Sequence, residues 1–316
     1  MTGAPMDYQQ LIDRETWDFI HKTQSHYPDE TVSFTIDQQR AVYDQMCAAF
    51  YAGRPDGVDV QDIAADAVPC RLYSPDHKRA IATIVYAHGG GFVVGGLDSH
   101  DDVCAEICAR TGARVLAVDY RLAPEHAHPA AYDDCITAIN WAAAQWDGPI
   151  VLAGDSAGGS LMACAAHALR QMPQLRGQLL IYPSLGAGQT ASLIAHANAP
   201  LLTAADMAFY RTIRTNGAEP PSDDPRFAAL ADRDFTALPP TILITADCDP
   251  LRDDSMIYTQ RLQAMGIPVL WVNEAGLVHG YLRARHSAAR ARASFGRIIR
   301  GLSALCNSDP LSQVVA

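Results

Sequence analysis

A short apolar run that ends in a serine between tiny residues constrains the fold of this chain more than any other stretch. Residues 150–158 read Ile-Val-Leu-Ala-Gly-Asp-Ser-Ala-Gly. The Gly-x-Ser-x-Gly pattern is typical of a serine on a tight strand-to-helix turn, because only small neighbours fit around such a turn. We therefore predict a strand, a turn that exposes the Ser156 hydroxyl, and a helix whose N-terminus points at it. An ordinary glycine-rich turn remains the alternative, because so short a pattern also occurs by chance.

Segments with strand and helix patterns alternate from residue 81 onward. Apolar runs predict strands, and amphipathic stretches predict helices between them. The expected strands are 81–86, 114–118, 150–153, 178–182, 241–245 and 269–272, and the expected helices are about 101–110, 130–146, 157–169, 252–265 and 287–305. Continuous apolar strands separated by helices favour an α/β fold, with a mostly parallel central sheet and helices on both faces. The alternating segment 68–73 contains Pro69 and is predicted to be an edge strand where the sheet begins.

Two segments interrupt this alternation, and we predict that they form a helical cap. Residues 1–55 have helical patterns, and residues 186–237 contain no clear strand and one helix that starts at a capping box of Thr203 and Asp206. So long an insertion usually has a function, such as covering a site. The remaining residues, 56–185 and 238–316, form the expected catalytic domain. A surface excursion packed against the sheet is the alternative.

Charge and cysteine content limit the expected partners. The formal net charge of −11 disfavours nucleic acid and anionic membrane surfaces as partners, because both would repel the protein. No apolar stretch is long enough to span a bilayer, and the N-terminus has no signal-peptide pattern, so we expect a cytoplasmic protein without membrane insertion. The eight cysteines are scattered, and only Cys104 and Cys108 are spaced as a helical pair of metal ligands. Because no second pair of ligands is nearby, we predict no metal. The serine chemistry described below needs no cofactor, and we predict none.

Three consecutive glycines after the strand at 81–86 predict a loop that approaches a ligand closely. The sequence there is His88-Gly89-Gly90-Gly91-Phe92. Backbone N–H groups of such a loop can stabilise the oxyanion of an acyl-transfer reaction, together with the N–H that follows the nucleophile. The expected donors are Gly90, Gly91 and Ala157. A phosphate loop is disfavoured because no Gly-Lys-Ser/Thr follows.

A serine nucleophile needs a histidine base and a carboxylate that orients it. Of the eleven histidines, His279 is the best candidate, because it follows the strand at 269–272 in a loop and is followed by Gly280. Asp247 and Asp249 both follow the strand at 241–245, so either could be the acid. All of these positions fall past the carboxyl ends of predicted strands, on the edge that carries Ser156.

Four ordered motifs closely resemble those of the hormone-sensitive-lipase-like esterases, the bacterial family IV carboxylesterases with the α/β-hydrolase fold. They are His88-Gly89-Gly90-Gly91, Gly154-Asp155-Ser156-Ala157-Gly158, Asp249-Pro250-Leu251-Arg252-Asp253 and His279-Gly280, and the segment Tyr120–His126 is also similar. The resemblance implies Ser156 as nucleophile, His279 as base, Asp249 as acid, and Gly90, Gly91 and Ala157 as the oxyanion hole. It implies bracing roles for His88 and Glu125, and a homodimer.

From the motifs and the resemblance together we expect a serine esterase that hydrolyses short-chain carboxylic esters through an acyl-enzyme. Phe92, Asp155 and Tyr210 are the residues that we expect to contact the substrate. A non-catalytic receptor for a small ligand is the alternative from another class, and the presence of His279 argues against it. Amide, lactone or thioester hydrolysis would use the same residues and stays open.

Overall fold

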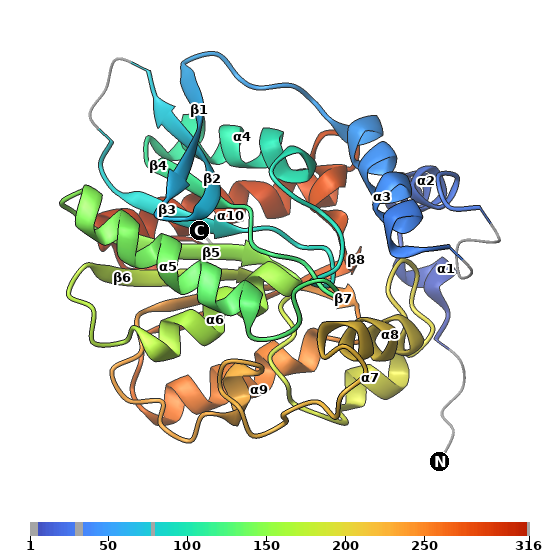
Figure 1. Cartoon of the computed structure of the whole chain (residues 1–316). Helices are drawn as coiled ribbons and strands as arrows, with labels where there is room; N and C mark the ends of the chain where they lie inside the picture. Colours follow the sequence, from blue (N-terminus) through green and yellow to red (C-terminus); the bar gives the residue numbers. More distant parts are fainter. Residues whose placement is uncertain (1–5, 29–33, 77–79, 315–316) are drawn as a thin grey trace.

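A single eight-stranded sheet forms the centre of the molecule (Figure 1). The computed structural model describes residues 6–28, 34–76 and 80–314. The strand order is β1-β2-β4-β3-β5-β6-β7-β8; β1 and β2 run antiparallel to their neighbours and all other pairs are parallel. The strands are β1 Val58–Ala65, β2 Val68–Pro75, β3 Thr83–Ala87, β4 Arg114–Val118, β5 Ile150–Asp155, β6 Leu175–Ile181, β7 Thr241–Cys248 and β8 Val269–Val278.

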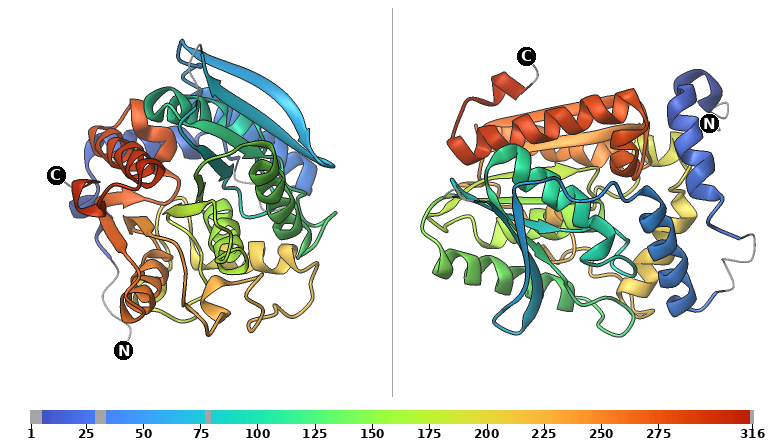
Figure 2. Two further views of the ribbon diagram at one scale, coloured as in Figure 1. Left: turned by 90° about the vertical axis from the view of Figure 1, so that its left-hand side faces the viewer. Right: turned by 90° about the horizontal axis from the view of Figure 1, so that it is seen from above.

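Helices cover both faces of the sheet because its central strands are apolar on both sides. On one face lie α4 (Asp101–Thr111) and α10 (Ala289–Asn307), and on the other lie α5 (Ala130–Gln145), α6 (Ala157–Ala168) and α9 (Arg252–Ala264), as Figure 2 shows. Residues of β3 alternate between the two layers: Ile84 packs with α4 and α10, and Val85 packs with α5 and α6. The mostly parallel α/β sheet predicted from the alternating pattern is therefore confirmed.

The antiparallel edge of the sheet differs from the prediction. β2 is not the edge strand, because β1 lies outside it and pairs with its whole length. The sequence does not reveal β1, because polar residues interrupt its half-buried apolar positions and leave no continuous apolar run. Pro69 lies just beyond the last β2–β4 pair, Cys70 and Val118, at the end of this ladder, and its carbonyl accepts from the Asp119 N–H at 3.0 Å.

Two groups of helices from distant parts of the chain lie together near the carboxyl ends of the parallel strands (Figure 1). The first group is α1 (Tyr8–Leu11), α2 (Arg14–Gln24) and α3 (Ile36–Phe50); the second is α7 (Ala191–Ala195) and α8 (Ala204–Arg214). The predicted capping box of Thr203 and Asp206 begins α8, whereas the short α7 is not evident in the sequence. The groups meet directly: the Tyr8 hydroxyl lies 3.2 Å from His196 Nδ1. No helix of the described residues is long and apolar enough to cross a bilayer.

Glycine at position 158 lets α6 approach the end of β3 closely. A Cβ atom there would lie 2.0 Å from the carbonyl oxygen of Ala87, which no real contact allows. We expect Gly158→Ala to lower the free energy of unfolding by at least about 3 kcal/mol, because neither backbone segment can move aside cheaply. Urea denaturation measures this loss.

The matched control is Gly112→Ala, at the left-handed end of α4. Gly112 has a φ of +67° and open space around its Cα, so alanine there costs only the backbone strain of about 1–2 kcal/mol. An equal loss of stability in both variants would contradict the close-approach argument.

Candidate active site

Ser156 occupies the sharp turn between β5 and α6. Its backbone is strained, with φ of 52° and ψ of −120°, and its N–H donates to the Ile181 carbonyl at 2.9 Å. The flanking glycines 154 and 158 permit this turn because a side chain at either position would overlap the backbone. The Ser156 Oγ lies 2.8 Å from the Nε2 atom of His279.

His279 connects Ser156 to a buried carboxylate. Its Nδ1 lies 2.7 Å from Oδ2 of Asp249, so Nδ1 carries the hydrogen and Nε2 is free to accept from the serine hydroxyl. Asp249 is fully buried after β7, and its other oxygen accepts from the Leu251 N–H at 2.8 Å. The ring of Tyr182 packs against the imidazole at a centroid distance of 4.6 Å. An unbroken chain of hydrogen bonds therefore runs from Ser156 to Asp249.

Asp247, the other candidate for the acid, forms hydrogen bonds with groups other than His279. Its carboxylate accepts from the Asn273 side chain at 2.9 Å and from the Gly276 N–H at 3.3 Å. No hydrogen bond or ion pair of the described residues joins Asp247 to His279. The structure thus pairs the histidine with Asp249, the residue in the Asp-Pro-Leu sequence.

The glycine loop after β3 bends so tightly that glycine is required. Gly90 has a φ of +130°, and a Cβ there would lie 2.0 Å from the Val94 carbonyl oxygen. The carbonyl of Gly90 accepts from the N–H groups of Val93 and Val94, both at 3.0 Å. Within the described part of the chain the N–H groups of Gly90 and Gly91 donate to no acceptor, and the N–H of Ala157 belongs to the first turn of α6, where helical partners are missing. These three groups are therefore free to bind an oxygen atom.

Asp155 joins this loop to the serine turn. Its carboxylate accepts from the Gly89 N–H at 3.0 Å and the Tyr86 hydroxyl at 2.8 Å, and its Oδ1 lies 3.2 Å from Nε2 of His100. Burial alone would raise the pKa of Asp155, but His100 and Tyr86 outweigh it and hold this pKa well below its usual range. The sequence predicts a substrate contact for Asp155. In the structure the side chain is buried and its oxygens are engaged by these donors, and the substrate contact stays a prediction.

The side chain of His88 also supports the glycine loop. Its ring stacks on Tyr120 at a centroid distance of 4.3 Å, and its Nδ1 lies 2.7 Å from the Gly89 carbonyl, so Nδ1 donates. The Tyr120 hydroxyl donates to the His88 carbonyl at 2.8 Å. Burial, helped by the nearby His100, lowers the pKa of His88 to about 4, so the ring is neutral at neutral pH.

Both groups of helices contact the glycine loop that follows β3. From α3, the Arg40 Nε donates to the Val93 carbonyl at 2.9 Å, and the same guanidinium pairs with Glu125 at 2.7 Å. From α8, the Tyr210 ring lies so close to Gly91 that a Cβ there would be 2.5 Å from the Tyr210 Cδ1. Phe92 is predicted to border the substrate, but its ring is nine-tenths buried in the core that contains α5 and α6.

Comparison with known proteins identifies the fold family. A family profile described as the alpha/beta hydrolase fold matches residues 84–283, about two thirds of the chain. The chain belongs to the α/β-hydrolase family. It falls in the hormone-sensitive-lipase-like branch, as its motifs predict.

Both sequence relatives and solved structures support this membership. A carboxylesterase NlhH of Mycobacterium tuberculosis is 38% identical over 250 residues, which cover 75% of this chain and 77% of that protein. An ethyl acetate hydrolase of Pseudomonas putida is 34% identical over 267 residues, covering 78% and 83%. An esterase of Pyrobaculum calidifontis superposes with a TM-score of 0.83 at 29% identity, covering 93% of this chain and 99% of that one.

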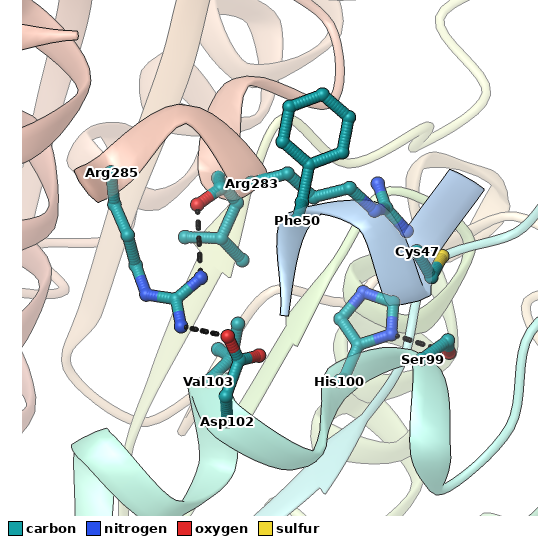
Figure 3. A pocket seen from close by; sticks show the side chains of 9 residues that line it. Cys47, Phe50, Ser99, His100, Asp102, Val103, Arg283 and Arg285 are labelled. Atoms are coloured by element: carbon teal, nitrogen blue, oxygen red, sulfur yellow. Dashed lines mark hydrogen bonds and ion pairs between the residues drawn. The ribbon is translucent and has the colours of Figure 1, made fainter. Parts of the chain in front are cut away.

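The remaining polar groups of this hydrolase include several that sequence patterns do not reveal. His100, Cys47 and Arg283 line a small cavity between α3, the start of α4 and the 3-10 helix Tyr281–His286 (Figure 3). His100 bonds to Ser99 there, and Arg283 donates to the Tyr43 hydroxyl at 2.5 Å. Nothing in the spacing of the eleven histidines distinguishes His100, because its importance comes from folding against Asp155. Among the described residues no three His, Cys, Asp or Glu side chains converge as metal ligands, and all eight cysteines are buried and free.

The low pKa of His88 predicts an acid-dependent loss of stability. The unfolded chain binds a proton near pH 6.5, whereas folded His88 binds one only near pH 4, so stability falls as the pH drops through this interval. His88→Asn keeps a donor for the Gly89 carbonyl but cannot be protonated. By pH 5 the native protein should lose about 2 kcal/mol more of its neutral-pH stability than the variant does. Urea denaturation at several pH values tests this, and identical pH profiles would contradict it.

Proposed function

We propose that this hydrolase is a serine esterase that cleaves short-chain carboxylic esters through an acyl-enzyme. The observation that carries the proposal is the chain of hydrogen bonds from Ser156 through His279 to the buried Asp249, at 2.8 and 2.7 Å. Names of the relatives agree with this reaction: a carboxylesterase and an ethyl acetate hydrolase are among them.

In the first half of the reaction, Ser156 attacks the ester carbonyl while His279 Nε2 takes the hydroxyl proton. Asp249 holds the imidazole in the required tautomer and stabilises the positive charge that forms on it. The carbonyl oxygen becomes negative in the tetrahedral intermediate, and the N–H groups of Gly90, Gly91 and Ala157 donate to it. His279 then gives its proton to the departing alcohol.

The second half repeats these steps with water. Water attacks the acyl-Ser156 carbonyl, and His279 takes one of its protons. The same three N–H groups stabilise the second oxyanion. Collapse of this intermediate returns the proton to Ser156 and releases the carboxylic acid.

Residues 1–55 and 186–237 act as a cap over a catalytic domain formed by 56–185 and 238–316. Support comes from the contacts of Arg40 and Tyr210, which bring α3 and α8 onto the loop that holds the proposed oxyanion donors. Because the Tyr210 ring lies against Gly91, an acyl chain bound beside the donors contacts this ring after only a few carbon atoms. The cap therefore favours small acyl groups.

The rival functions differ in what they require of the site. A non-catalytic receptor has no need for a histidine that is hydrogen-bonded to both the serine and a buried carboxylate, so this geometry favours an enzyme. Amide, lactone and thioester hydrolysis need the same groups, and a panel of acyl substrates assayed on the purified protein separates them from ester hydrolysis.

Asp249→Asn should lower kcat by about 10⁴-fold, because the amide favours the wrong tautomer of His279. Ser156→Ala and His279→Ala should lower kcat at least as much, since the three residues act as a unit. Asp247→Asn is the matched control, because Asp247 follows the same strand but, among the described residues, forms no hydrogen bond or ion pair with His279. Hydrolysis of p-nitrophenyl butyrate measures kcat. A larger loss from Asp247→Asn, or an active Ser156→Ala, would refute the assignment.

Acyl groups of about two to six carbons should be the best substrates, because beyond that length each methylene no longer adds its usual binding gain of about 0.8 kcal/mol. Tyr210→Ala should move the maximum of kcat/KM toward longer chains. Phe209→Ala is the control, since Phe209 is the neighbouring aromatic residue of α8 and is exposed. The series of p-nitrophenyl esters from acetate to palmitate tests both. A native maximum at long chains, or the same profile in Tyr210→Ala, would count against the cap as the selective element.

A further inference from the structure

One face of α8 contacts two consecutive residues of the glycine loop. Tyr210 and Arg214 are four residues apart, so their side chains lie on the same face of the helix. Tyr210 packs against Gly91, and the guanidinium of Arg214 lies over the ring of Phe92 at 3.8 Å from its centroid. The two contacts together fix the helix against the loop.

Arg214 is held in an unusual environment for an arginine. Only 7% of it is exposed, and no carboxylate forms an ion pair with it among the described residues. Its guanidinium carbon instead lies over two aromatic rings, 3.8 Å from the centroid of Phe92 and 4.0 Å from that of Phe227. The Nη1 atom donates to the Phe227 carbonyl at 3.0 Å. Burial lowers the pKa of Arg214 to about 10, so the group stays charged at neutral pH.

Phe92 needs such support because of its backbone. Its φ of +68° lies in the left-handed region, which is unfavourable for an aromatic residue without a local restraint. The flat guanidinium attracts the face of the ring and stops the loop from relaxing toward negative φ. Phe92 directly follows Gly90 and Gly91, so a change in its backbone turns their N–H groups.

We propose that Arg214 is a positioning residue that holds the oxyanion loop in its donating conformation by clamping Phe92 against Phe227. The inference rests on the proposed function, because it assumes that the N–H groups of Gly90 and Gly91 bind the oxyanion. Arg214 does not touch the substrate and acts only through Phe92. The clamp therefore stabilises the transition state more than it stabilises bound substrate.

The test replaces Arg214 with methionine, which keeps a long apolar side chain and removes the charged, planar guanidinium group. Arg214→Met should lower kcat for p-nitrophenyl butyrate by about 10²-fold, the scale of a misplaced or missing oxyanion donor. KM should change less than about threefold, and Ki for a trifluoromethyl ketone that forms a tetrahedral adduct should rise by the same factor as kcat/KM falls. Arg211→Met is the control on the same helix, because Arg211 is exposed, and both constants should stay within about twofold of native.

A double-mutant cycle tests whether Arg214 acts through Phe92. In a Phe92→Leu background, which lacks the aromatic ring, Arg214→Met should cause little further loss of kcat. Independent, multiplying losses would overturn the clamp. If Arg214→Met does not fold, Arg214→Lys is the test variant. Lysine keeps the positive charge but lacks the planar group that lies over the two rings. The kcat and the affinity for the inhibitor should therefore both fall about tenfold.

A purely structural role predicts a different pattern. It would lower the unfolding midpoint of Arg214→Met while leaving kcat and inhibitor affinity of the folded fraction native, and this result would overturn the proposal. Ser156→Ala is assayed in parallel. If Ser156→Ala retains turnover, the proposed function fails. If it is inactive while Arg214→Met is native in kcat and Ki, only the clamp fails.

Discussion

The close approach between the end of β3 and the serine turn is the constraint on which the rest of the site depends. Glycine at position 158 lets the backbone of α6 meet the Ala87 carbonyl, where any side chain would collide. The Asp155 carboxylate then joins the two segments by accepting the N–H of Gly89. The strained turn and the glycine loop are thereby held next to each other, as the proposed mechanism requires for a hydroxyl and several N–H groups to face one carbonyl.

Buried polar groups around the serine turn and the glycine loop are accommodated in different ways. Asp155 is surrounded by donors, so its negative charge is retained. His88 is buried and lies near His100, and these two effects lower its pKa, so the ring stays neutral although its Nδ1 donates to the Gly89 carbonyl. Arg214 is buried, forms no ion pair with a carboxylate of the described residues, and lies over two aromatic rings while it donates to the Phe227 carbonyl. In each case the neighbouring groups offset the free-energy cost of burying the polar side chain.

Much of the fold follows from local patterns. The apolar run 114–118 coincides with β4, and the capping box at Thr203 and Asp206 begins α8. β1 could not be found because its alternation is interrupted by polar residues, and β8 runs on to Val278 past its apolar start. The buried apolar strands thus leave a local signature, whereas an edge strand and the length of a strand depend on which neighbour is available to pair.

The site residues also divide into those with a local sequence signature and those without one. Short motifs identify Ser156, His279 and the glycine loop, because a tight turn and a glycine run leave a local signature. Strand ends alone leave Asp247 and Asp249 both open as the acid, and the family resemblance implies Asp249. The fold hydrogen-bonds Asp249 to His279 and Asp247 to Asn273. His100 and Arg214 have no signature, since their partners are 55 and 122 residues away along the chain (155 minus 100 and 214 minus 92).

Trapping the acyl-enzyme tests the central claim most directly. Rapid acid quenching during turnover of p-nitrophenyl acetate, followed by intact-protein and peptide mass spectrometry, measures where and how much acetyl group is bound. The account predicts one acetyl group per chain, carried by the peptide that contains Ser156 and absent after Ser156→Ala. Acetylation of a different residue, or an initial burst of p-nitrophenol that persists in Ser156→Ala, would contradict it.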